Sequence, residues 1–337
     1  QPTHATKVPR AAFTWVTHAV RKHLTVPVIT SNRINTPEVA ERVLANGDAD
    51  LISMARPFLA DPEFVNKAAA NQAERINTCI GCNQACLDHV FNGKTSSCLV
   101  NPRACEETRI IIAPTQAIKT IAIVGAGPAG LACAVTAAER GHKVTLYDAA
   151  SEIGGQFNIA KRIPGKEEFS ETLRYFEVRL KELNVEVKLD TSLTTQALNQ
   201  MQVDELVLAT GVSPRQLALP GHNHAKVLNY LEVIKGVNVG PKVAIIGAGG
   251  IGFDVAEFLT HGTHEPSTNV TQFMSQWGID MTMQARGGVA EIPQNIEASP
   301  REIYLLQRKT SKVGAGLGKT TGWVHRLSLI QSPSPRD

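Results

Sequence analysis

Two glycine-rich turns, each joining an apolar stretch to a helical one, constrain the fold of this chain most. The first turn, Gly125-Ala-Gly127-Pro-Ala-Gly130, follows the apolar residues Ile121–Val124. A helix through Arg140 and a second strand, Lys143–Tyr147, lead to Asp148. Such glycines allow a tight turn and a close approach to a pyrophosphate, and an acid about 20 residues on can bind ribose hydroxyls. The pattern predicts a dinucleotide site formed by Gly125, Gly127, Gly130 and Asp148.

The run Glu152-Ile-Gly-Gly-Gln156 comes directly after this unit. Its two glycines could bring the backbone close to a bound cofactor, and the alternative is a simple turn. Further on, a helical stretch from Glu167 to Leu183 precedes two more strands, Val185–Leu189 and 205–211.

The second turn contains Gly247, Gly249 and Gly252 and follows the strand Lys242–Ile246. The chain therefore predicts two dinucleotide sites. The acid expected after the next strand is absent, because a polar insertion intervenes and Ile303–Gln307 is followed by Arg308 and Lys309. Basic residues there favour a ribose 2′-phosphate, and hence NADPH over NADH. The alternative is a solvated basic turn.

Four cysteines precede the first glycine turn with the spacing C-x2-C-x3-C-x11-C: Cys79, Cys82, Cys86 and Cys98. Three close thiolates and one distant thiolate can surround an iron–sulfur cluster. A structural zinc site is the alternative, but zinc more often uses two C-x-x-C pairs. Disulfides are a weaker alternative, because the N-terminus is polar and no secretory leader is evident. We expect a cytoplasmic, reduced protein.

The segment before the cysteines alternates helix and strand. Amphipathic residues 11–22 and a helix from Pro37 to about Ala45 frame two short apolar strands, at residues 26–31 and 49–54, which we expect to be buried on both faces. In a βα barrel the loops after the last two strands commonly bind a phosphate. Those loops would contain Arg33, Ala55 and Arg56, and both arginines could instead be ordinary solvated residues. Two βα units cannot close a barrel, so we expect the chain to begin inside a domain.

Composition excludes several classes of function. The chain has 337 residues, of which 43% are hydrophobic and 19% charged, with a formal net charge of +3. A charge this small indicates neither a nucleic-acid surface nor a membrane surface. No run of about 18 apolar residues is present to span a membrane. We expect two or three globular domains, a small-molecule substrate and a monomer.

Six stretches in this order resemble the old yellow enzyme-related iron–sulfur flavoproteins, the group that includes bacterial 2,4-dienoyl-CoA reductases. They are Val8–Phe13, Met54–Asp61, Thr78–Cys86, Gly125–Gly130, Glu152–Phe157 and Gly318–Arg326. The resemblance implies an α/β chain with the C-terminal part of a TIM barrel, an iron–sulfur loop and nested Rossmann-like FAD and NADPH domains. We place these at residues 1–75, 76–119, 120–235 and 236–337.

The same resemblance implies where the cofactors bind. Arg33, Ala55 and Arg56 would contact FMN, and the four cysteines would hold a [4Fe-4S] cluster. Gly125, Gly127, Gly130, Asp148 and Gln156 would line FAD. Gly247, Gly249, Gly252, Arg308 and Lys309 would face NADPH.

The implied activity is NADPH-dependent reduction of 2,4-dienoyl-CoA thioesters in unsaturated fatty-acid β-oxidation. Electrons would pass from NADPH to FAD, the cluster, FMN and then the acyl-CoA substrate. The proton donors of the family are expected before Gln1, and the closing strand of the FAD domain after Asp337. We therefore expect a fragment of a longer protein without dienoyl reduction of its own, and we assign no catalytic residue.

Other members of the group are alternatives: an enoate or bile-acid reductase, or an amine dehydrogenase. The second glycine turn and Arg308–Lys309 argue against the dehydrogenase, which does not take electrons from NADPH. A non-catalytic electron-transfer subunit resembling the small subunit of glutamate synthase is the alternative from another class. The barrel-like segment from Val26 to Asp61 argues against that subunit.

Overall fold

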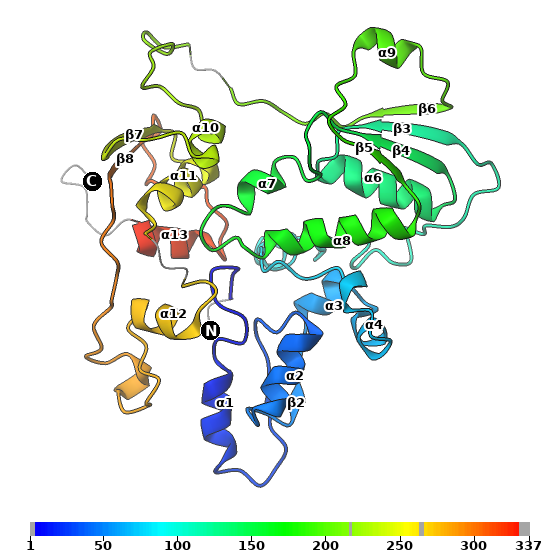
Figure 1. Cartoon of the computed structure of the whole chain (residues 1–337). Helices are drawn as coiled ribbons and strands as arrows, with labels where there is room; N and C mark the ends of the chain where they lie inside the picture. Colours follow the sequence, from blue (N-terminus) through cyan, green and yellow to red (C-terminus); the bar gives the residue numbers. More distant parts are fainter. Residues whose placement is uncertain (1–3, 216–217, 263–265, 330–337) are drawn as a thin grey trace.

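The computed structural model describes residues 4–215, 218–262 and 266–329. Within them the strands form three parallel sheets, with the orders β1-β2, β5-β4-β3-β6 and β7-β8. Figure 1 shows three corresponding units, with the N-terminal segment below the two units that contain the larger sheet and β7-β8. The protein is therefore an α/β fold in which helical crossovers connect the parallel strands of each sheet.

The N-terminal segment contains two strands and their helices. Its elements are α1 (Thr14–Arg21), β1 (Ile29–Thr30), α2 (Pro37–Ala45), β2 (Leu51–Ile52), α3 (Arg56–Ala60), α4 (Phe64–Ala69) and η1 (Ala73–Arg75). Thr36 caps α2 by accepting a hydrogen bond from the Val39 backbone N–H, and Pro37 stands at its start. Val39 and Val43 lie four residues apart on α2 and pack with Ala11 and Ile34 in a small core. The helix predicted at Pro37–Ala45 is thus confirmed.

The prediction that both strands of this segment are buried on two faces was wrong. Ile29 on β1 is 58% exposed and Leu51 on β2 is 53% exposed. Among the described residues these two strands pair only with each other, so neither gains the second neighbour that a buried parallel strand has. The pairing nonetheless brings the carboxyl ends of β1 and β2 together, because Thr30 lies opposite Ile52.

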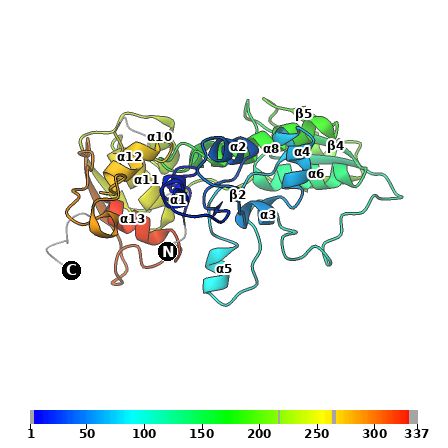
Figure 2. The same cartoon turned by 90° about the horizontal axis from the view of Figure 1, so that it is seen from below.

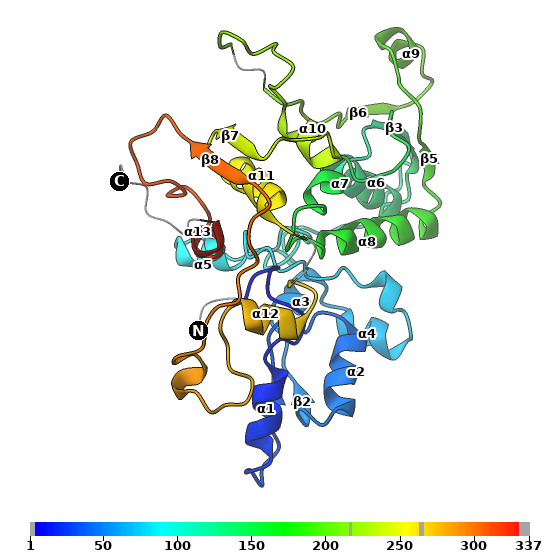
Figure 3. The same ribbon diagram turned by 60° about the vertical axis from the view of Figure 1, so that its left-hand side comes forward.

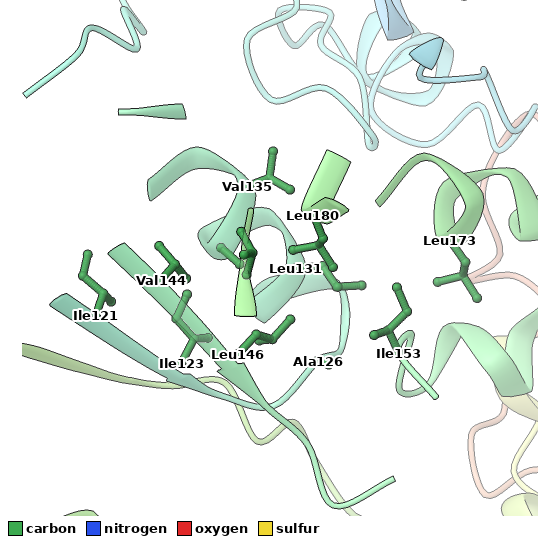
Figure 4. Close-up of a cluster of buried hydrophobic side chains, with 12 residues drawn as sticks. Ile121, Ile123, Ala126, Leu131, Val135, Val144, Leu146, Ile153, Leu173 and Leu180 are labelled. Atoms are coloured by element: carbon green, nitrogen blue, oxygen red, sulfur yellow. The ribbon is translucent and has the colours of Figure 1, made fainter. Parts of the chain in front are cut away.

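The next unit is built on the four-stranded sheet. Its elements are β3 (Thr120–Val124), α6 (Pro128–Glu139), β4 (Lys143–Tyr147), α7 (Phe157–Ala160), α8 (Phe169–Glu182), β5 (Glu186–Lys188), α9 (Thr195–Asn199) and β6 (Glu205–Leu208). Helices α6 and α8 lie on the same side of the sheet (Figure 1). Side chains from this side, including Ile123, Leu131, Leu146 and Leu180, form the core shown in Figure 4. This core fixes the strand β3, which leads into the first glycine turn.

The third unit is smaller and surrounds β7 and β8. Its elements are α10 (Tyr230–Lys235), β7 (Lys242–Ile246), α11 (Gly250–Thr260), α12 (Val270–Gln276), η2 (Arg286–Gly288), β8 (Glu302–Leu306) and α13 (Gly322–Leu329). Val255 and Leu259 of α11 pack with Val233 and Ile234 of α10 and with Ile163. The second glycine turn thus stands between β7 and a helix whose inner face is buried.

The three units are packed together by side chains that lie far apart in the sequence. Phe273 and Met274 of α12 pack against Val8 and Ala12 of the N-terminal segment. Lys7 forms an ion pair of 2.6 Å with Glu257 on α11. The cysteine segment contains one short helix, α5 (Leu87–Phe91), which projects from the body in Figure 2 and lies beside α13 in Figure 3. The third unit therefore packs directly on the N-terminal segment.

Candidate functional site

The first glycine turn has the geometry that a dinucleotide needs. Gly125 has a φ of 109°, and a Cβ there would lie 2.2 Å from the Ala209 carbonyl oxygen. A Cβ at Gly130 would lie 1.8 Å from the Gly125 carbonyl oxygen, so helix α6 can approach the turn only with glycine there. A Cβ at Gly127 would meet no described atom within 4 Å. Space therefore remains beside Gly127, the N-cap of α6, for a pyrophosphate.

Asp148 holds this turn from the end of β4. Its Oδ2 accepts a 2.6 Å hydrogen bond from the Ala126 N–H, and its Oδ1 accepts from the Ala150 N–H at 2.8 Å. The loop of the Glu152–Gln156 run docks on the same turn, because the Gly154 N–H donates to the Ala126 carbonyl at 2.8 Å. Gln156 is exposed, and its Nε2 donates to the Val212 carbonyl at 3.0 Å. Asp148 and Gln156 thus border the turn, and their contacts with FAD stay predictions.

The second glycine turn repeats the first. Gly247 has a φ of 119°, and its N–H donates to the Leu306 carbonyl at 2.8 Å. A Cβ at Gly252 would lie 1.8 Å from the Gly247 carbonyl oxygen, whereas one at Gly249 would meet no described atom within 4 Å. The two turns therefore share one construction, in which the third glycine admits the helix and the middle glycine faces open space.

Arg308 and Lys309 follow β8, the parallel neighbour of β7, at the same end of the sheet as the second turn. Both side chains are exposed. The Gln307 Nε2 donates to the carbonyl oxygens of Lys309 and Ser311 and so folds the backbone of this basic turn. The two cations therefore lie at the same end of the sheet as the second turn, and their contact with the ribose phosphate of NADPH stays a prediction.

The four predicted cysteine ligands line one cavity. Cys79, Cys82, Cys86 and Cys98 are free thiols, and they surround about 300 Å³ of space free of protein atoms, part of it open to solvent. Arg56 and Asn83 lie in the same wall. The described residues contain no group of three or more His, Cys, Asp or Glu side chains that could hold a metal ion. The four cysteines are therefore the ligand type of an iron–sulfur cluster and line one cavity, but their side chains as placed do not form a metal-binding group, and the cluster stays a prediction.

The pKa values of three thiols of this cavity, those of Cys82, Cys86 and Cys98, are raised above the ordinary value of a cysteine. Burial, reinforced by the charges of the other cysteines, raises the pKa of Cys82 to about 12. Burial likewise raises the pKa of Cys98 to about 11 and raises the pKa of Cys86, which the charge of Arg56 partly opposes. Thiolates become favourable here only when a cation or a cationic cluster core compensates them.

Arg33 is buried and is therefore not an ordinary solvated loop residue. Arg33 is 5% exposed and lies just beyond β1, where Asn32 and Arg33 have φ values of 76° and 54°. Its Nη2 donates to Glu168 at 2.9 Å, and its Nε donates to the Val8 carbonyl at 2.7 Å. Its guanidinium is thus committed to a carboxylate, and its predicted contact with FMN stays a prediction.

Arg56 is half-buried and faces the cysteine cavity. Its Nη1 donates to the His4 carbonyl at 2.7 Å and to the Oδ1 of Asn83. Ala55, the residue before it, is exposed at the end of β2. Of the three residues predicted to contact FMN, Arg33 and Arg56 already use their guanidinium groups in hydrogen bonds within the chain, whereas Ala55 has no polar side chain.

Sequence reasoning missed the residues that tie the cysteine loop to helix α8. Glu168, just before α8, accepts from Arg10 at 2.6 and 2.8 Å and from Asn35 at 3.1 Å. The Nδ2 of Asn35 also donates to the Cys79 carbonyl at 2.8 Å. No spacing in the sequence indicates this network, because Glu168 and Arg10 are 158 residues apart.

Arg174 on α8 makes the second tie. Its Nη2 donates to the Ile76 carbonyl at 2.7 Å and to the Thr78 hydroxyl at 3.1 Å, and its Nη1 donates to the Glu74 carbonyl. These acceptors lie immediately before Cys79. Helix α8 thus holds the segment of residues 74–78 that leads into the cysteine cavity.

Two family models match the chain. Residues 119–284 match the pyridine nucleotide-disulphide oxidoreductase model, and residues 3–75 match the NADH:flavin oxidoreductase / NADH oxidase model. Within the described residues no helix is long and apolar enough to cross a membrane.

Curated relatives share about a third of the aligned residues. The chain is 38% identical over 328 residues to a metal reductase of Desulforamulus reducens, and this alignment covers 96% of the chain and 48% of the relative. It is 32% identical over 334 residues to an NADH oxidase of Thermoanaerobacter brockii, covering 95% of this chain and 51% of the relative. A cinnamate reductase of Clostridium sporogenes is 36% identical over 242 residues, which are 71% of this chain and 36% of the relative. The chain therefore spans about half or less of these relatives.

A solved structure gives the same relationship. The complex of 2-naphthoyl-CoA reductase with 2-naphthoyl-CoA matches 91% of this chain and 51% of its own chain, with a TM-score of 0.76 and 27% sequence identity. Histamine dehydrogenase from Rhizobium sp. 4-9 matches with a TM-score of 0.69 at 19% identity and so shares the fold.

Proposed function

We propose that this chain delivers electrons for an NADPH-dependent enoyl reduction. Two findings support the proposal: the chain has homologues among the old yellow enzyme-related flavin reductases, and it combines a segment that matches the NADH:flavin oxidoreductase model with a unit that matches the pyridine nucleotide-disulphide oxidoreductase model. The proposed substrate class is an acyl-CoA thioester with conjugated double bonds, of which 2,4-dienoyl-CoA is the simplest member. The proposed residents are FAD, FMN and a [4Fe-4S] cluster.

One observation carries this proposal: the cysteine cavity is lined in part by the N-terminal segment, and the residues just before it are held by helix α8 of the nucleotide-binding unit. Arg56 of the N-terminal segment lines the cavity, while Arg174 of α8 holds the residues that lead into it. When bound, the nicotinamide and flavins supply two-electron chemistry and the cluster supplies one-electron transfer, so a cluster between two flavins connects the two kinds of step.

The residues of this chain have distinct roles in the proposal. Gly127 and Gly249 leave room for the two pyrophosphates, and Asp148 fixes the first turn while its remaining acceptor capacity is available for a ribose. The four thiols hold the cluster. His4 is an unsuitable proton donor, because burial and the charges of Arg56 and Arg33 lower its pKa to about 4 and leave it neutral at pH 7.

The choice of substrate rests on the relatives. Cinnamate and 2-naphthoyl-CoA, named in two of them, are both conjugated acyl compounds, and the second is a CoA thioester. The choice of NADPH rests on Arg308 and Lys309, which replace the usual acid with two cations. The domain limits at residues 75, 119 and 235, the monomeric state and the cytoplasmic location are parts of the same proposal.

The test begins with the purified chain, reconstituted anaerobically with iron and sulfide. We expect about four iron and four sulfide per chain, as a [4Fe-4S] cluster requires. Bound flavin should be released as FAD, with FMN as the second flavin. Zinc in place of iron, or one equivalent of metal without sulfide, would refute the proposed electron relay.

The substrate is tested with a protein of the relatives' full length that contains this sequence. NADPH oxidation should depend on an added 2,4-dienoyl-CoA. A variant in which serine replaces all four predicted cysteine ligands should lose this dienoyl-CoA-dependent oxidation while keeping NADPH-dependent reduction of ferricyanide through FAD. Oxidation without any dienoyl-CoA dependence would reject the substrate class.

A metal-reducing activity is the second candidate, since the metal reductase relative aligns with 96% of the chain. Soluble ferric citrate added in place of the thioester separates the two. A rate with ferric citrate that exceeds the rate with every conjugated thioester would favour this second candidate.

A further inference from the structure

Asn83 is a buried amide beside the cysteine cavity with one half unpaired. It lies between Cys82 and Cys86, lines the cavity and is 1% exposed. Its Nδ2 has no hydrogen-bond partner in the part of the chain that the structure describes. Buried donors without a partner are rare in folded proteins, and each calls for an acceptor such as an ion or a ligand. The acceptor for Asn83 must therefore be sought in the cavity that it lines.

Arg56 fixes the orientation of this amide. A guanidinium has only donors, so the hydrogen bond from its Nη1 selects the Oδ1 of Asn83 and leaves Nδ2 as the unpaired half. The Nη1 of Arg56 is itself held by the His4 carbonyl at 2.7 Å. Arg56 also lines the cavity, and so brings a positive charge to the four thiols. The wall of the cavity thus contains one unpaired buried donor and one cation.

We propose that Arg56 and Asn83 are positioning and tuning residues of the iron–sulfur cluster, with the Nδ2 of Asn83 donating a hydrogen bond to a cluster or cysteine sulfur. This inference rests on the proposed function, because it requires the four-cysteine cluster. Reduction adds a negative charge to the cluster, and both a nearby cation and an N–H···S bond stabilise that charge. Together they raise the reduction potential.

The same geometry explains why position 83 carries asparagine. Asn83 has a φ of 60°, in the left-handed region that asparagine tolerates better than most residues. Glycine would keep this backbone and remove only the amide. Asn83→Gly is therefore a clean test of the side chain.

The experiment measures the midpoint potential of the reconstituted cluster. Wild type, Asn83→Gly and Arg56→Gln are titrated with dithionite while the reduced cluster is followed by electron paramagnetic resonance. Both variants should have a more negative midpoint than wild type, at equal iron and sulfide content per chain. The control is Arg103→Gln, which removes the same charge five residues after Cys98 but does not line the cavity.

The outcomes separate this inference from the proposed function. A wild-type chain that binds no iron and sulfide would reject the proposed function, and the inference with it. A normal wild-type cluster with unchanged midpoints in both variants would overturn the inference alone. Should a variant fail to load, Asn83→Ser or Arg56→Lys replaces it, and a smaller shift in the same direction is expected. No shift in these replacements would likewise overturn it.

Discussion

At the scale of single residues, two glycines of one turn have opposite roles. Gly130 touches the Gly125 carbonyl so closely that no Cβ fits, whereas Gly127 faces space. Gly130→Ala should lower the free energy of unfolding by about 3 kcal/mol, because the turn and helix must separate. Gly127→Ala should change it by less than about 1 kcal/mol but weaken FAD binding. Urea unfolding of the apoprotein and fluorescence titration with FAD measure the two effects, and equal stability losses would contradict this assignment.

A second prediction at this scale concerns the nicotinamide nucleotide. Replacing both Arg308 and Lys309 with serine should weaken NADPH binding about tenfold, equivalent to about 1.4 kcal/mol, and leave NADH binding unchanged. Isothermal titration calorimetry with both nucleotides measures this. Lys312→Ser is the matched control, since Lys312 is an exposed cation in the same turn region. An equal loss for NADH would mean that the two cations do not recognise the 2′-phosphate.

At the scale of elements, helix α8 supports the cysteine loop through one face. Arg174 holds residues 74–78, while Arg179 on the same helix pairs with Glu139 of α6 at 2.8 Å. Arg174→Ala removes three hydrogen bonds to residues 74–78, each contributing about 1 kcal/mol, so the amides of residues 74–79 should exchange hydrogen about a hundredfold faster. Arg179→Ala should accelerate exchange in this segment much less, because Arg179 reaches it only through Glu182, which pairs with Arg75 at 2.8 Å. Hydrogen exchange followed by mass spectrometry makes the comparison, and similar acceleration in both variants would count against a support specific to Arg174.

At the scale of the whole molecule, Glu168 joins the N-terminal segment to the larger nucleotide unit. Burial alone would raise its pKa, but hydrogen bonds and charges from Arg10 and Arg33 lower it from 4.5 to about 2. A carboxylate with a lowered pKa stabilises the fold above pH 4.5 and loses that contribution as the pH falls through about 2.

Glu168→Gln should therefore lower the free energy of unfolding by about 3 kcal/mol at pH 7, with a smaller difference from wild type at pH 3. Urea unfolding at both pH values measures it. Glu171→Gln, which removes the more exposed partner of Arg10, should have a smaller effect. A difference that stays constant with pH would show that ionisation of Glu168 is not the cause.

The local elements of this architecture were predictable from sequence, and the contacts between units were not. Both glycine turns and helix α2 were confirmed, because short-range periodicity and glycine spacing determine them. The spacing of the cysteines also placed all four around one cavity. The pairing of Arg33 with Glu168, 135 residues away, was not predicted. A partner at such a distance leaves no periodic pattern, and only the folded chain reveals it.

The cysteine segment is held in part by residues near the C-terminal end of the described chain. Asp88, in the helix that starts directly after Cys86, accepts hydrogen bonds from the N–H and hydroxyl of Thr320 at 3.0 and 2.9 Å. These partners are separated by 232 positions, so the contact cannot form until ribosomal synthesis has passed Thr320. The cysteine segment consequently reaches its final packing only late, after translation of both glycine-turn units.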